Sequence, residues 1–168
     1  YRADLSLDFA DWWGGIQGQL SLYGQRLEAG YSAPGLNTLT ETDQYGGVLR
    51  MPVTDEIDLT AKADRTVQDR GLETTATEID VAYQVTDNWI VQAGARHDER
   101  DDDSAVVTAT QEEGDRTDAV VQVEFDTNGR WRTYAFGQAT VHSTGDRDEN
   151  LRGGIGGAYR LNDRIALN

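Results

Sequence analysis

Residues 77–96 alternate between apolar and polar side chains along two segments, and this pattern most constrains what the chain can fold into. Apolar side chains fall on every second position, at Ile79, Val81, Tyr83, Val85, Trp89, Val91, Ala93 and Ala95. Because successive side chains of a β-strand point to opposite faces, this period predicts two strands, each with one apolar face. Residues 86–88 (Thr-Asp-Asn) have turn chemistry, so we predict a hairpin.

The same alternation recurs along nearly all of the 168 residues. The chain has 18 glycines and 2 prolines, and no stretch has the period of an amphipathic helix. We predict one all-β domain over residues 1–168, or part of one, folded as an antiparallel up-and-down meander of about 10–12 strands. The chain starts without a methionine and stops within an alternating run, so we expect a mature segment or a fragment.

Two kinds of protein carry strands with one apolar face: a soluble sandwich, and a transmembrane barrel with lipid outside and water inside. The mean hydropathy is −0.63, and no apolar run approaches the roughly 18 residues of a membrane helix. Neither observation excludes a barrel, because only alternate residues of a barrel strand face lipid. The net charge of −15 repels phosphates, so we expect no binding to nucleic acid.

The expected connections between strands alternate in length. Short turns are predicted at residues 24–26, 54–56, 86–88, 126–129 and 162–163. Longer polar breaks are predicted between them, at residues 34–44, 68–71, 97–118 and 143–150. Short turns at one rim and long loops at the other are typical of outer-membrane barrels.

Aromatic residues are expected in two bands at the two ends of the strands. Tyr83, Trp89, Phe125, Trp131 and Tyr159 lie near short turns, and Trp12, Trp13, Tyr31 and Tyr45 are expected near the opposite ends. Two such bands match the aromatic girdles of a membrane protein. A sandwich would instead concentrate aromatics in its core.

On these patterns the chain resembles a Gram-negative outer-membrane β-barrel, although it carries no motif of one family. The resemblance implies a transmembrane β-barrel in the bacterial outer membrane, in contact with lipid and lipopolysaccharide. It implies a porin-like channel or membrane anchor, without enzymatic activity and without a cofactor. The terminal aromatic strand typical of such barrels is missing at Asn168, which fits a fragment or a chain that continues.

The polar faces carry the residues expected to line the barrel lumen. These are Asp58, Lys62, Asp64, Glu78, Asp80, Arg96, Glu124, Arg132, Arg152 and Arg160. Acids crowd the first part of the chain and arginines the later part, so a closed sheet would set an acidic wall against a basic one. Small polar solutes or ions are then the expected cargo. Solvated strand faces without any role in transport are the alternative.

No catalytic or metal-binding residues are expected. The acidic runs at 98–103 and 146–149 lack the spacing of known calcium loops, so solvated loops are preferred. His142 and Thr144 are two residues apart, which faintly resembles the nucleophile and base of outer-membrane phospholipases. Two alternatives therefore stay open: a soluble, secreted, acidic β-sheet module for binding or structure, and a barrel hydrolase acting on lipid.

Overall fold

The computed structural model describes residues 1–12, 14–15, 17–30, 32–33, 36–37, 40–103, 113–127, 130–162 and 165–167. The main sheet consists of β1 (Arg2–Asp8), β2 (Gln19–Leu27), β5 (Thr42–Pro52), β6 (Ile57–Gln68), β7 (Leu72–Gln84), β8 (Trp89–Asp102), β9 (Gly114–Asp126), β10 (Trp131–Ser143), β11 (Leu151–Asn162) and β12 (Ile165–Leu167). The 3-10 helix η1 (Phe9–Asp11) follows β1. The strands β3 (Ser32–Ala33) and β4 (Leu36–Asn37) form a separate pair.

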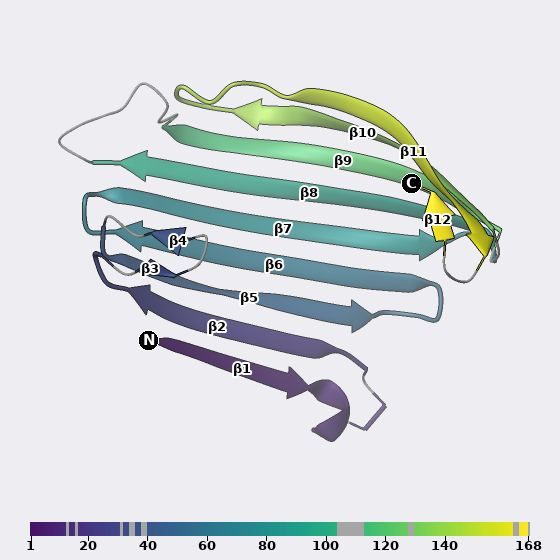
Figure 1. Ribbon diagram of the computed structural model, residues 1–168, viewed down its shortest axis with the longest axis horizontal. Coiled ribbons are helices and arrows are strands. Elements are labelled where there is room, and N and C mark those ends of the chain that lie inside the picture. Colours follow the sequence, from purple (N-terminus) through teal and green to yellow (C-terminus); the bar gives the residue numbers. More distant parts are fainter. Residues whose placement is uncertain are drawn as a thin grey trace.

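The ten strands of the main sheet lie side by side in chain order, and each pairs antiparallel with its neighbours (Figure 1). The predicted all-β antiparallel meander is therefore confirmed. Within the described residues, β1 and β12 form the two edges and are not paired with each other, so the sheet is open. The closure expected of a barrel is not present in this structure.

Three of the expected connections are wrong. Residues 24–26 lie inside β2, where Gly24 is paired with Ala3 and Tyr45 as an ordinary strand residue. The expected long break at 68–71 is a tight turn of three residues between β6 and β7. Much of the expected break at 97–118 is strand, because β8 continues to Asp102 and β9 begins at Gly114.

Three short turns at one end of the sheet use the same threonine chemistry. The hydroxyl of Thr54 accepts hydrogen bonds from the backbone N–H groups of Glu56 and Ile57, at 3.2 and 3.1 Å. Thr86 does the same for residues 88 and 89, and Thr127 accepts from the N–H of residue 131. Such side-chain bonds satisfy backbone groups that the sheet leaves open in a turn. The other two residues of the predicted Asn-Gly turn, 128 and 129, lie outside the described residues.

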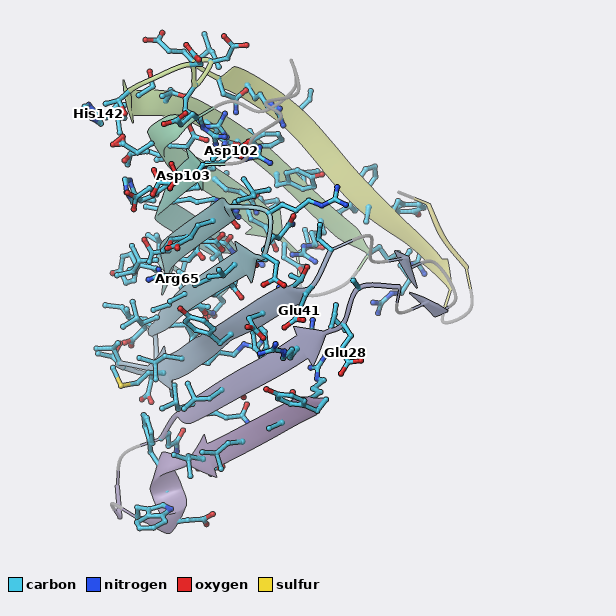
Figure 2. All side chains as sticks on the ribbon, turned by 90° about the vertical axis from the view of Figure 1, so that its left-hand side faces the viewer. Glu28, Glu41, Arg65, Asp102, Asp103 and His142 are labelled. Carbon is cyan, nitrogen blue, oxygen red and sulfur yellow. The ribbon has the colours of Figure 1, made fainter. Side chains whose placement is uncertain are left out.

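The sheet is strongly curved where β10 meets β11, and glycines on β11 allow it. Tyr134 and Phe136 lie directly opposite Gly156 and Gly154. A Cβ atom on either glycine would come within 2.5 to 2.7 Å of the facing aromatic ring. Figure 2 shows that β11 arches away from the side on which Arg65 and His142 project.

The burial of side chains is the reverse of that in a soluble domain. Among the described residues no hydrophobic side chain is buried, whereas Asp102, Asp118 and Glu124 are only 9, 4 and 3% exposed. The strand register places these three acids on one face of the sheet. We call this the polar face. The opposite face is the apolar face, and its described hydrophobic side chains are exposed or half-exposed.

Candidate functional site

All ten residues predicted to line the lumen lie on the polar face. The pairing of neighbouring strands from β6 to β11 puts all of them on the same side of the sheet. They are Asp58, Lys62, Asp64, Glu78, Asp80, Arg96, Glu124, Arg132, Arg152 and Arg160. The alternation seen in the sequence therefore places the charged residues on a common surface. Three ion pairs bring five members of this set into contact, with Glu78 shared by two of the pairs.

One row of side chains crosses four strands with alternating charge. Lys62, Glu78, Arg96 and Asp118 lie opposite one another on β6, β7, β8 and β9. Lys62 donates to the Glu78 carboxylate, and the Arg96 guanidinium lies 3.5 Å from the same group. Opposite charges placed across a strand pair stabilise the register. Acidic and basic residues therefore alternate on these central strands instead of forming two separate walls.

Asp118 is the most enclosed member of this row. Its carboxylate accepts a 2.6 Å hydrogen bond from the Thr140 hydroxyl and a 3.3 Å bond from the Gln138 amide. Arg116 Nε lies 3.3 Å from it. A buried carboxylate is tolerated only when its oxygens are paired in this way. An open pocket of about 250 Å³ lies beside it, and Glu78, Asp80 and Gln138 contribute to its lining.

A second cluster lies where β8 and β9 approach the connection between β10 and β11. Arg147, in that connection, donates to Asp98 on β8. Arg116 Nη1 donates to the backbone carbonyl of Asp148 at 3.4 Å. Arg147 is nearly buried, at 9% side-chain exposure. These contacts hold residues 144–150 against the polar face at this end of the sheet.

A bidentate pair joins β9 and β10 near the short-turn end. Arg132 Nε and Nη2 lie 2.6 and 2.8 Å from the two carboxylate oxygens of Glu124. The two partners differ in exposure, since Glu124 is 4% and Arg132 57% exposed. Fork-like geometry makes this ion pair directional as well as strong.

The apolar face carries a continuous band that we call the apolar belt. Its members are Leu5, Leu7, Leu20, Leu22, Tyr45, Gly47, Leu49, Met51, Ile57, Leu59, Ala61, Ala63, Ile79, Val81, Tyr83, Trp89, Val91, Ala93, Ala95, Ala119, Val121, Val123, Phe125, Trp131, Ala135, Gly137, Ala139, Leu151, Ile155 and Tyr159. Ile79, Val121 and Ile155 are 50, 52 and 89% exposed. An apolar surface this continuous is rare on a soluble monomer and marks a surface for contact with a protein, a ligand or a membrane.

Aromatic side chains gather at the short-turn end of the apolar belt. Trp89 packs against Phe125, and Trp131 packs against Tyr159. In each pair the rings are tilted, with centroids 4.8 and 4.7 Å apart. Tyr83 lies at the same end of β7. These five residues form the first expected band.

The second expected aromatic band is not reproduced as predicted. Trp12 lies in the connection between β1 and β2, at the same end as Trp89, so its predicted position was wrong. The sequence pattern missed this because the turn expected at residues 24–26, which lie inside β2, added a reversal of the chain after Trp12. Tyr45 lies toward the other end of β5. Trp13 and Tyr31 are outside the described residues.

The two histidines share one row on the apolar face, beyond the belt. Thr117 on β9 is paired with His97 on one side and with His142 on the other. His97 Nδ1 lies 2.9 Å from the Thr117 hydroxyl. A register shift between residues 140 and 142 brings His142 to this face, which the sequence alone could not indicate. The hydroxyl of Thr144, considered above as a nucleophile, donates to the Asp115 carboxylate.

No three His, Asp or Glu side chains in the described ranges are arranged to hold a metal ion. Asp98, one of the residues weighed as a calcium ligand, is instead an acceptor for arginine. The described part of the chain also has no helix long and apolar enough to cross a membrane.

Comparison with known proteins adds no relative. The chain matches no family model, no curated protein and no solved structure.

Proposed function

We propose that this chain forms the wall of a transmembrane β-barrel in a bacterial outer membrane, where it serves as a porin-like channel or a membrane anchor. The observation that carries the proposal is the reversal of burial. The buried residues Asp102, Asp118 and Glu124 lie on the polar face, while the belt opposite exposes large apolar side chains such as Ile79 and Val121. This distribution suits a wall with lipid on one side and water on the other.

The aromatic residues at the short-turn end of the apolar belt support the same proposal. Tyr83, Trp89 and Trp131 lie at this end, and the two tryptophans each pack against a second ring. Aromatic rings favour the boundary between lipid and water because one part of the ring is apolar and another polar. In a barrel, the outer edges of β1 and β12 must also be paired, since lipid offers no hydrogen bonds to a strand edge.

A soluble, acidic β-module is the second candidate, and the height of the belt on β8 favours it. On β8 the belt covers Trp89 to Ala95, which spans about 20 Å at roughly 3.4 Å per residue. Membrane barrels have an apolar band about 25 Å tall on tilted strands. On β11 the belt runs from Leu151 to Tyr159 and reaches about 27 Å by the same rise. The two candidates differ in what covers the belt.

Flotation with liposomes separates the two candidates. The refolded chain should stay dispersed only in detergent, should float with vesicles, and should resist extraction by alkaline carbonate. A chain that remains monomeric without detergent and stays with the aqueous fraction would support the soluble module instead.

Conduction tests the channel function separately from membrane insertion. If the barrel encloses water, the net charge of −15 should enrich cations at its mouth, less so at high salt. Planar-bilayer recordings in a salt gradient should then give a reversal potential that indicates a preference for cations. Insertion without conductance would leave the anchor as the function, and anion preference would contradict the charge argument.

A further inference from the structure

Two aromatic rings cover glycines on the polar face, where the sheet bends between β10 and β11. Tyr134 and Phe136 stand two positions apart on β10, directly opposite Gly156 and Gly154. A Cβ atom added to these glycines would come within 2.5 Å of Tyr134 and 2.7 Å of Phe136. Tyr134 is 38% exposed and Phe136 is half-buried, so both rings are accessible to a ligand. We call this pair the aromatic platform, and β11 arches toward its side of the sheet (Figure 2).

The strands that carry the aromatic platform are free of acidic residues. The chain contains 30 aspartates and glutamates, yet β10 and β11 include none. The nearest acids on the polar face of β9 are Asp118 and Glu124, and each already pairs with an arginine. The surface around the platform is therefore cationic, in contrast to the rest of the chain.

Arg152 lies beside the aromatic platform and provides a positive charge there. It is opposite Gln138 and two positions before Gly154, on the same face of the sheet. Its side chain is exposed, and no carboxylate in the described residues forms an ion pair with it. An uncompensated charge favours a ligand of opposite sign. A carboxylate suits a guanidinium because it accepts two parallel hydrogen bonds.

Amide side chains border the platform on the side away from β11. Gln122 on β9 lies directly opposite Phe136, and Gln92 on β8 lies opposite Gln122. Within the described part of the chain, neither amide forms a side-chain hydrogen bond. An amide has two donors and one acceptor oxygen, which together match hydroxyl groups.

We propose that the polar face over β10 and β11 binds a sugar acid, a pyranose that carries one carboxylate. The carboxylate lies at Arg152, one C–H face of the sugar packs on the aromatic platform, and hydroxyl groups bond to Gln122. Residues two apart on a strand are separated by roughly 7 Å, so a single sugar ring reaches from the platform to Arg152. The site needs only water at the polar face, so the inference goes beyond the proposed membrane location.

Each of the three features disfavours a simpler ligand. A neutral sugar would leave the charge of Arg152 uncompensated. An aromatic carboxylate would leave the amide of Gln122 without a partner, and a small anion such as acetate would gain nothing from the platform. The face of an aromatic ring is negative and attracts the weakly positive C–H groups of a sugar.

Binding of three probes to the refolded chain in mild detergent tests the proposal. Glucuronate has a sugar ring and a carboxylate, glucose has the sugar ring alone, and benzoate has a carboxylate on an aromatic ring. Saturation-transfer NMR titrations at low salt give a dissociation constant for each probe. The wild-type chain should bind glucuronate at least about tenfold more tightly than glucose, as expected of a charge-assisted hydrogen bond. It should also prefer glucuronate to benzoate.

Arg152→Gln should abolish the preference for glucuronate over glucose while glucose still binds. Arg50→Gln is the matched control, because Arg50 is exposed on the same face and no described acid forms an ion pair with it. Its neighbours across the strands are Gln19 and Thr60 instead of aromatic rings. This control should keep the preference of the wild-type chain.

Two further variants test the platform and the amide. Phe136→Leu should weaken the binding of both sugars by about fivefold and leave the preference for glucuronate over glucose unchanged. Gln122→Leu should instead reduce the preference for glucuronate over benzoate. These changes in selectivity separate a role in binding from a general loss of folded protein.

Equal affinity of the wild-type chain for glucuronate and glucose would overturn the charge assignment, and so would equal effects of Arg152→Gln and Arg50→Gln. Tighter binding of benzoate than of glucuronate would overturn the sugar as the ligand. If the wild-type chain bound none of the three probes, the whole site would be overturned. The membrane proposal would then still stand, because flotation with liposomes tests it separately.

Discussion

The ring of Tyr23 lies over Gly46, and its hydroxyl donates a hydrogen bond to Asp64, two strands away from Tyr23. A Cβ atom at Gly46 would lie 3.0 Å from the Tyr23 ring and 2.5 Å from the backbone carbonyl of Ala63. The glycine thus lets an aromatic side chain bridge β2 and β6 on the polar face. The same device recurs between β10 and β11, where rings cover Gly154 and Gly156.

Replacing Gly46 with alanine should destabilise the sheet. The added methyl group must displace backbone as well as the ring, so we expect a loss of about 1–3 kcal/mol in the free energy of unfolding. Gly24→Ala is the control, since a Cβ there meets nothing within 4 Å. It should be neutral or slightly stabilising because it restricts the unfolded chain. Denaturant titration followed by circular dichroism measures both, and equal effects would contradict the bridge.

The ion pair of Glu124 and Arg132 should respond asymmetrically to mutation. Arg132→Met leaves the buried Glu124 carboxylate without its partner. Breaking a fully buried pair costs about 3–5 kcal/mol, and the cost here should be lower because Arg132 is half-exposed. Glu124→Gln leaves an arginine that is 57% exposed and can be hydrated, so its effect should be much smaller. Urea midpoints of the two variants test this. A larger loss for Glu124→Gln would show that burial of the carboxylate has been misjudged.

A charge on the apolar belt should be costly in a membrane. Ala93→Arg places a guanidinium in the middle of the belt on β8, which should cost about 2–4 kcal/mol near the bilayer midplane. Gln92→Arg, its neighbour on the polar face, is the control and should cost far less. Unfolding from lipid vesicles measures the difference. Similar values for the two variants would remove the distinction between the faces.

The sequence predicted the fold well where alternation is unbroken. The hairpin around residues 86–88 was predicted and is confirmed, with Val85 N–H donating to the Trp89 carbonyl at 2.9 Å. The period of two also placed all ten charged candidates on one face. The local pattern is sufficient to assign the two faces here because each strand has one consistently apolar side.

The sequence did not predict the strands that consist of charged residues. It also did not predict the contacts between side chains that depend on how neighbouring strands are aligned. Residues 97–102 read as loop because they are charged, yet they pair with β7, and residues 97–100 also pair with β9. Asp98 is held there by arginines from β9 and from the connection after β10, which are distant in sequence. The alternating row from Lys62 to Asp118 depends on the relative shift of four strands. No local signal in the sequence encodes that shift.

Spin labels at Val81 and Gln92 test most directly whether the apolar face meets lipid. Val81 lies in the belt on β7, and Gln92 lies on the polar face of the neighbouring strand, one row away. In reconstituted vesicles, molecular oxygen should relax the label at Val81 more strongly, and a water-soluble nickel complex should relax the label at Gln92 more strongly. Equal access of both quenchers to both sites would contradict the membrane wall.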